Sequence, residues 1–141
     1  MEDKLCVLLV ASERHGQEFL RVLGATQVAY EIIIANDLEA AAAALTRRPI
    51  PIAVVDVRGV QQRSDLDPAL HFFRRHPGLL GILSLAYYEG PVTGELFQQW
   101  PSGIMVEGVY TYLWRPWYPE GVRRLLERAA DAVRQGGRQY A

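Results

Sequence analysis

At the middle of the 141-residue chain lies the stretch Pro51-Ile-Ala-Val-Val-Asp-Val-Arg-Gly59. Its four consecutive apolar residues, 52–55, are too few for a helix and too continuous for a half-exposed strand, so they predict a strand buried on both faces of a parallel sheet. In such sheets ligands and chemistry are found beyond the carboxyl ends of the strands, and we expect Asp56 at that end. The alternative interpretation is that Asp56 only shapes the turn before Gly59.

Four more apolar runs predict strands, and amphipathic segments lie between most of them. The additional strands are predicted at residues 5–10, 30–34, 79–86 and 108–114. Apolar residues at helical spacing predict three helices that end at Gly24, before Pro49 and at Pro77, and a last helix after Pro119. The interval from Tyr87 to Gly108 has a weaker pattern, with a short helix around residues 92–100 as one interpretation.

Two of these helices have recognisable start signals. Asn36, followed three residues later by Glu39, resembles a capping box. Asp67-Pro68 resembles an N-cap with proline at the first helical position. We therefore expect the second helix to begin after Asn36 and the third after Asp67.

The alternation of strand and helix, five times over, predicts an α/β fold. Right-handed crossovers place the helices on both faces of a parallel sheet. For a sheet of this size the expected strand order is 2-1-3-4-5, which is the flavodoxin-like, doubly wound (βα)5 arrangement. The length is that of one domain, and we assign residues 1–135 to it and residues 136–141 to a polar tail.

Composition argues against several classes of function. The formal net charge is -1 and no basic run exceeds an arginine pair, so no nucleic-acid-binding face is expected. The single cysteine, Cys6, excludes an internal disulfide and a multi-cysteine metal site. The start of the sequence fits neither a signal peptide nor a membrane span, so we expect a cytoplasmic protein with no membrane contact.

The loop after the first predicted strand is poorly suited to binding phosphate. It has the sequence Ala11-Ser-Glu-Arg-His-Gly16, whereas the phosphate of FMN or of a dinucleotide needs a glycine- or hydroxyl-rich loop. His15, His71 and His76 are scattered, and no nucleophile with its base and no metal-ligand spacing accompanies them. We therefore expect no cofactor, no catalytic residue and no enzymatic activity.

The ends of the third and fifth predicted strands together carry the residues of a known family motif. Asp56, together with the closing signature Tyr112-Leu-Trp-Arg-Pro-Trp117, resembles the response-regulator receiver domain of two-component signalling. The resemblance covers nearly the whole chain, and it implies that Asp56 stands at the position of the aspartate that accepts a phosphoryl group. It also implies that Tyr112 occupies the position of the family's aromatic switch residue. The alternative for Tyr112 is a strand aromatic packed against the fourth helix.

Other site positions depart from the family pattern. The family holds Mg²⁺ with two adjacent acidic residues where this chain has Ala11 and Ser12, and Glu13 comes one place too late. A hydroxyl and one carboxylate make a weak magnesium site, so we expect no metal. Leu85 aligns with the family's Thr or Ser, unless a slip of one residue puts Ser84 there, and that slip would turn Ser84 toward the other face of the sheet.

Arg115 replaces the family's lysine, which keeps the positive charge but changes its shape. We hypothesise that Arg115 forms a standing ion pair with Asp56 in an atypical receiver, or pseudo-receiver, that is not phosphorylated efficiently. A solvent-separated pair is the alternative geometry.

These observations predict a signalling module of a two-component phosphorelay that acts by protein–protein interaction. Its partner would be a histidine kinase or an output domain in trans, and the resemblance implies a homodimer through the fourth helix, fifth strand and fifth helix. Exposed aromatic residues near the last strand would mark a contact surface; the candidates are Tyr110, Trp114, Trp117 and Tyr118. Two other interpretations stay open: a genuine but slow phosphoacceptor at Asp56, and a small flavodoxin-like ligand-binding domain or enzyme.

Overall fold

The computed structural model describes residues 4–24, 29–60, 63–87 and 109–136. The interval 88–108, for which the sequence suggests a short helix, lies outside the described residues. The fourth helix of the predicted fold and the tail beyond residue 136 therefore lie outside them as well.

The described strands form one five-stranded sheet in the order β2-β1-β3-β4-β5, in which every adjacent pair is parallel. In chain order they are β1 Leu5–Val10, β2 Tyr30–Ala35, β3 Ile52–Val60, β4 Leu80–Tyr87 and β5 Val109–Trp114. β1 pairs with β2 on one side and β3 on the other, so the direction of winding reverses at β1. The predicted α/β class and strand order are confirmed.

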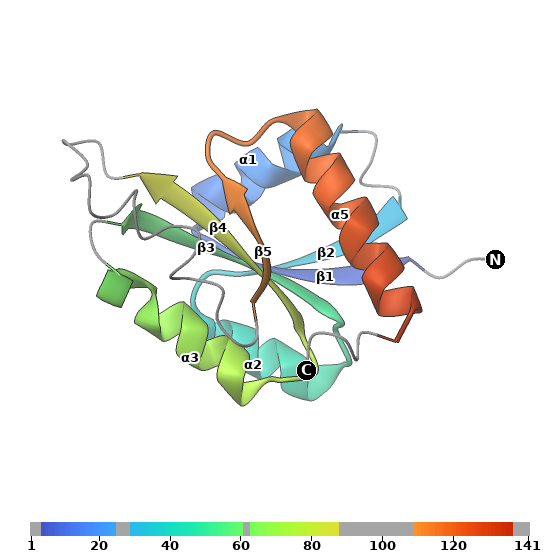
Figure 1. Ribbon diagram of the computed structural model, residues 1–141, viewed down its shortest axis with the longest axis horizontal. Helices are drawn as coiled ribbons and strands as arrows, with labels where there is room; N and C mark the ends of the chain where they lie inside the picture. Colours follow the sequence, from blue (N-terminus) through green and yellow to red (C-terminus); the bar gives the residue numbers. More distant parts are fainter. Residues whose placement is uncertain (1–3, 25–28, 61–62, 88–108, 137–141) are drawn as a thin grey trace.

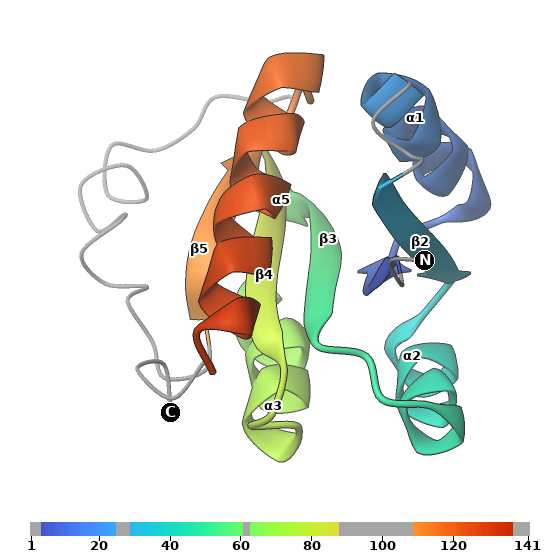
Figure 2. The ribbon, with the colours of Figure 1, turned by 90° about the vertical axis from the view of Figure 1, so that its right-hand side faces the viewer.

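Helices cover both faces of this sheet (Figures 1 and 2). α1 Glu13–Leu23 and α5 Pro119–Arg134 lie on one face, and α2 Leu38–Arg47 and α3 Asp67–Arg75 lie on the other. A short 3-10 helix, η2 Arg63–Leu66, precedes α3. None of the described helices has the length and apolarity to cross a lipid bilayer.

Alternation along the strands divides the core between the two faces. On β3, Ile52 and Val54 belong to the core beneath α1 and α5, whereas Ala53 and Val55 belong to the core beneath α2 and α3. Both sets are buried, as expected for a central parallel strand. Within one strand, odd and even positions therefore face opposite layers of helices.

The first helix begins and ends at capping residues. The Ser12 hydroxyl accepts a hydrogen bond from the backbone N–H of His15 at 3.3 Å. Gly24 ends α1 with a φ of 53°, in the left-handed region that glycine tolerates best, so the predicted end is confirmed.

The predicted starts of α2 and α3 are each wrong by one residue. The N-cap of α2 is Asp37 rather than Asn36, because the Asp37 carboxylate accepts a hydrogen bond from the N–H of Ala40 at 2.7 Å. The N-cap of α3 is Leu66, without a side-chain cap, and Asp67 is already helical because η2 runs directly into α3.

β3 extends beyond its predicted end. Val57 pairs with Leu85 and Val60 pairs with Tyr87, with a shift of register between these two pairs. Asp56 therefore lies within the strand, and the expectation that it follows the strand is wrong. Because β4 continues alongside, the backbone after Asp56 forms ladder hydrogen bonds instead of turning.

Candidate functional site

The side chain of Asp56 lies between the sheet and the layer formed by α1 and α5. Asp56 follows Ile52 and Val54 at alternate positions of β3, and both of these residues belong to the core on that face. The side chain of Asp56 is only 1% exposed. A carboxylate in such a place needs hydrogen bonds or a counter-charge, because an isolated buried charge is very costly.

Both oxygens of the Asp56 carboxylate have partners. The Ser84 hydroxyl donates to Oδ1 at 2.9 Å, and the Arg115 guanidinium donates through Nη1 to Oδ2 at 3.3 Å. The contact with Arg115 is a direct ion pair, as hypothesised from the sequence, and the solvent-separated alternative is not the geometry observed.

Arg115 follows β5 directly and connects three parts of the fold. Its backbone N–H donates to the carbonyl of Leu85 at 2.9 Å, which fixes the exit of β5 against the end of β4. Its guanidinium also forms an ion pair with Glu18 of α1, through Nη2. The side chain is 13% exposed, so both ion pairs are largely shielded from solvent on the arginine side.

Trp117 contacts both Ser84 and Arg115, the two partners of Asp56. Its indole Nε1–H donates to the Ser84 hydroxyl at 2.9 Å. The Arg115 guanidinium carbon lies 4.3 Å from the centroid of the Trp117 ring, within the range of a cation–π contact. Phe19 of α1 packs edge-on against the same ring with 5.1 Å between centroids. We call Glu18, Asp56, Ser84, Arg115 and Trp117 the Asp56 network.

The Asp56 network corrects the assignment of Leu85 to the site. Leu85 is fully buried in the core beneath α2 and α3, on the opposite face from Asp56. Ser84 faces Asp56 because the two residues are paired in register and both follow the alternation that turns them toward α1 and α5. The sequence argument correctly placed Ser84 on the opposite face of the sheet from Leu85. The Asp56 side chain lies on the same face as Ser84, so Ser84 and not Leu85 belongs to the site.

Burial and hydrogen bonding act in opposite directions on the Asp56 carboxyl. Desolvation raises the pKa of Asp56 above its ordinary value, although the Ser84 hydrogen bond and the charge of Arg115 lower this pKa in part. Desolvation is the largest of these effects. The Asp56 carboxyl is therefore ionised less readily than a surface aspartate, despite the nearby Arg115 guanidinium.

The three residues after β1 do not supply a metal site. Ala11 is buried in the core and donates its N–H to the carbonyl of Ala35 at 3.0 Å. Ser12 caps α1 and its hydroxyl lies 2.6 Å from His15 Nδ1, while Glu13 is exposed in the first turn of the helix. Among the described residues no three His, Cys, Asp or Glu side chains are grouped so that they could hold a metal ion.

His15 lies at the edge of the Asp56 network but not within its hydrogen bonds. Desolvation lowers the pKa of His15, and the charges of Arg115 and Arg58 lower this pKa further. The neutral imidazole is therefore favoured at pH 7.

The predicted aromatic group is divided between core and surface. Trp117 is buried, Tyr110 is half-buried against the core beneath α1 and α5, and Tyr118 is 67% exposed. Tyr112 is half-buried against the opposite core, beneath α2 and α3. The side chain of Trp114 lies outside the described part of the molecule. Of this group, the structure exposes Tyr118 to a partner.

A shallow hollow of about 390 Å³ lies at the carboxyl edge of the sheet, where the winding reverses. It is lined by the end of β1, the start of α2, residues 55–58 of β3 and the start of α3. The Asp56 carboxylate scarcely reaches it, because that side chain is 1% exposed. Arg58, Asp37 and Asp65 give the rim mixed charge.

Sequence reasoning missed Glu18 and the hydrogen-bonding role of Trp117. A signal for Ser84 is present in the sequence, because Asp56 and Ser84 each follow buried residues at a spacing of two in neighbouring strands. No comparable signal marks Glu18, whose contact with Arg115 joins residues 97 positions apart.

No protein-family model and no curated protein matches this chain. Several solved structures do resemble it. The receiver domain of AraT, a response regulator from Geobacillus stearothermophilus, is 18% identical, with 96% of this chain and 100% of that chain covered and a TM-score of 0.66. A response regulator receiver domain protein from Clostridium thermocellum is 16% identical over 93% of this chain and 98% of that chain, with a TM-score of 0.66. The chemotaxis protein CheY4 from Vibrio cholerae is 19% identical over 90% of this chain and 99% of that chain, with a TM-score of 0.60. At these identities the likeness concerns the fold.

Proposed function

We propose that this chain, which has the fold of response-regulator receiver domains, is a signalling module that acts by binding a protein partner and does not accept a phosphoryl group efficiently at Asp56. The observation that carries the proposal is the state of the Asp56 carboxylate. Its side chain is 1% exposed, and Ser84 and Arg115 each engage one of its oxygens.

The chemistry of phosphoryl transfer explains why this state matters. To form an acyl phosphate, a carboxylate oxygen must bond to the donor's phosphorus while the bond from phosphorus to the leaving oxygen breaks. Two anions must approach each other, and a divalent cation normally screens them. By the resemblance to receiver domains, Ala11 and Ser12 take the positions of the two carboxylates that would hold this cation, and the Arg115 guanidinium, which also pairs with Glu18, already engages one oxygen of Asp56.

The proposal includes a cytoplasmic location for this chain and a protein as its partner. A cytoplasmic module without enzymatic activity of its own would transmit its signal by contact with a histidine kinase or with an output domain in trans. Homodimerisation would use the described β5 and α5 together with the segment that precedes them. Tyr118, exposed between β5 and α5, is the aromatic residue that such a contact would bury.

Intact-mass analysis after incubation with acetyl phosphate and Mg²⁺ tests the proposal. We expect no added phosphoryl group on the wild-type chain, under conditions that label an ordinary receiver domain run in parallel. Arg115→Ala frees one carboxylate oxygen and serves as a second sample, and Asp56→Asn removes the acceptor. A single phosphoryl group on the wild type that is absent from Asp56→Asn would refute the proposal.

One observation favours a second candidate, a slow but genuine phosphoacceptor. The Ser84 hydroxyl and the Arg115 cation both contact Asp56, and both groups suit a phosphoryl oxygen as well as a carboxylate. This candidate predicts that labelling of the wild type is slow but complete, and that Arg115→Ala changes its rate. A time course of the same mass measurement separates the two candidates.

A further inference from the structure

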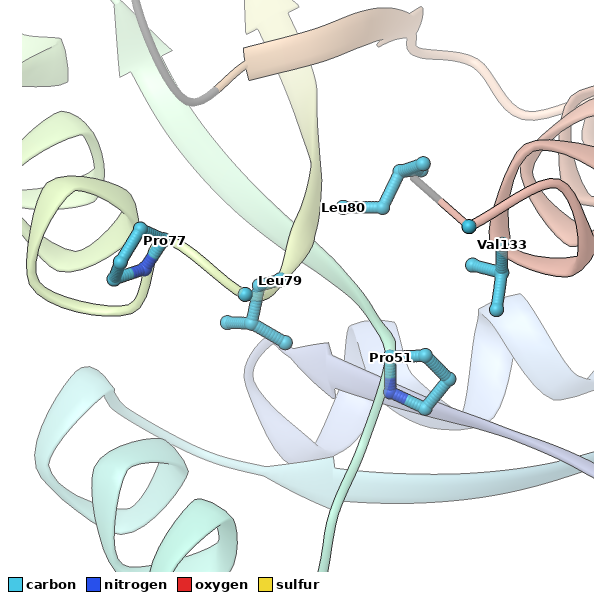
Figure 3. Close-up of a pocket in the computed structure, with 7 residues that line it drawn as sticks. Pro51, Pro77, Leu79, Leu80 and Val133 are labelled. Atoms are coloured by element: carbon cyan, nitrogen blue, oxygen red, sulfur yellow. The ribbon is translucent and has the colours of Figure 1, made fainter. Parts of the chain in front are cut away.

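A second hollow lies at the amino-terminal edge of the sheet, at the opposite end of the strands from Asp56. A shallow groove of about 720 Å³ runs between the ends of α2 and α3. Its lining residues are Leu45, Pro49, Ile50, Pro51, Arg75, His76, Pro77, Gly78 and Leu79. A smaller pit of about 90 Å³ adjoins it, and Figure 3 shows Pro51, Pro77, Leu79, Leu80 and Val133 around this pit.

The groove and the pit share part of their lining, so together they form one surface. Pro51, Pro77, Gly78 and Leu79 contribute to both. The pit has the size of one aliphatic side chain, whereas the groove is too open to enclose a small molecule. A peptide that places one apolar side chain in the pit and lies along the groove fits this shape.

The groove is held in shape before any partner binds. Pro49, Pro51 and Pro77 have fixed φ angles, which leaves this backbone little freedom. The turn after α3 is closed by the N–H of Leu79, which donates to the carbonyl of His76 at 3.0 Å. The N–H of Leu80 donates to the carbonyl of Pro51 at 2.8 Å, which ties β4 to the entry of β3. A preformed site loses less entropy on binding.

The groove carries positive charge at its lining and close to its ends. Arg75 is exposed and lines the groove, and Arg47 and Arg74 lie in the last turns of the two helices that end there. Within the described part of the chain none of these three arginines has a carboxylate within 4.0 Å, whereas the adjacent Arg48 is paired with Glu31 at 2.6 Å. Among the residues that the structure describes, no acidic side chain lines the groove or the pit.

We propose that this groove binds an acidic, apolar segment of a protein partner, with one aliphatic side chain of that segment in the pit and its carboxylates at Arg75 and the neighbouring arginines. A second copy of the chain is disfavoured, because a two-fold axis through the groove would place Arg75 near Arg75. The surface is independent of Asp56, so this inference stands apart from the function proposed above.

Titration of the isotope-labelled chain with two synthetic decapeptides, followed by NMR, tests the inference. One peptide alternates leucine with glutamate, and the matched peptide has lysine in place of each glutamate. We expect the acidic peptide to shift the amide signals of Leu45, Gly78 and Leu79 saturably at up to about 1 mM, the limit of weak specific binding. The lysine peptide is expected to leave these signals unchanged.

Two pairs of variants test whether the groove itself is responsible. Arg75→Glu should weaken binding at least about tenfold, while Arg128→Glu on the exposed side of α5 should not change it. Gly78→Phe should abolish binding and Gly121→Phe should not, since a Cβ at either glycine meets no atom within 4 Å and both variants are expected to fold. Asp56→Asn should bind as the wild type does.

Three results would overturn the inference. One is the absence of saturable shifts at the groove, and another is equal binding of the two peptides. The third is a concentration-dependent shift of the same amides without peptide, which would identify a second copy of the chain as the occupant.

Discussion

Replacement of Ser84 by alanine is the sharpest test of the Asp56 network. Ser84 is fully buried, and its hydroxyl both donates to Asp56 Oδ1 and accepts from Trp117 Nε1, each at 2.9 Å. Ser84→Ala removes both hydrogen bonds with almost no change of volume. It leaves an indole N–H and one carboxylate oxygen unpaired in a region from which water is excluded.

The expected loss of stability follows from these two contacts. A hydrogen bond to a charged group contributes about 1.5–3 kcal/mol, and a buried donor left unpaired costs about 1–3 kcal/mol. Because some local rearrangement is expected, we predict a decrease of about 2–4 kcal/mol in the free energy of unfolding. With a urea m-value of about 2 kcal/mol/M, the unfolding midpoint would fall by about 1–2 M.

Urea unfolding followed by far-ultraviolet circular dichroism measures this loss. Ser64→Ala makes the same chemical change at an exposed site and should alter the free energy by less than about 0.5 kcal/mol. The Ser84 hydrogen bond lowers the pKa of Asp56, so the deficit of Ser84→Ala should also shrink at acidic pH, where the carboxyl is neutral. A Ser84→Ala variant as stable as Ser64→Ala would refute the reasoning.

Three further substitutions probe the remaining members of the network. Trp117→Phe keeps most of the ring packing but removes the N–H donor to Ser84, so urea unfolding should show a loss of about 1–2 kcal/mol; an unchanged midpoint would mean that this bond is not formed in solution. Glu18→Gln removes a 39% exposed partner of Arg115 and should cost less than about 1 kcal/mol in the same assay, and a larger cost would show that Glu18 is as critical as the buried members. Because desolvation raises the pKa of Asp56, the wild type should lose stability relative to Asp56→Asn as the pH rises from about 4, the ordinary aspartate value, through the folded-state pKa; thermal unfolding curves that stay parallel across this range would contradict that pKa shift.

Much of the fold follows directly from local pattern. Buried runs such as residues 52–55, the amphipathic spacing of the helices and the glycine after α1 each depend on neighbours in the sequence, and the structure contains these elements, although β3 continues past its predicted end. The starts of α2 and α3 were less predictable, because Asn36 and Asp37 are equally good caps by type and only the backbone direction at Asp37 selects one.

The geometry around Asp56 depended on information that is not local. The end of β3 is determined by the length of β4 beside it, since each strand supplies the other's hydrogen bonds. Once the strand continues past Asp56, the alternation turns its carboxylate toward α1 and α5, where Ser84 lies and Leu85 does not. The pairing of Asp56 with Arg115 was foreseen from the resemblance to receiver domains, in which an aspartate after the third strand and a cation after the fifth share one site, although β4 lies between those strands in the sheet.

The long reach of Arg115 has a consequence for the order of folding. Its side chain joins Glu18, 97 positions earlier, to Asp56, 59 positions earlier. Closing loops of this length precedes any gain from the contacts themselves, so such contacts form late and their formation slows folding. During synthesis the first four strands can associate before Arg115 has left the ribosome, and Asp56 then has no guanidinium beside it. Because a buried carboxylate without its counter-charge is costly, we expect the first four strands alone to be less stable than the whole domain, so that the domain unfolds as one cooperative unit.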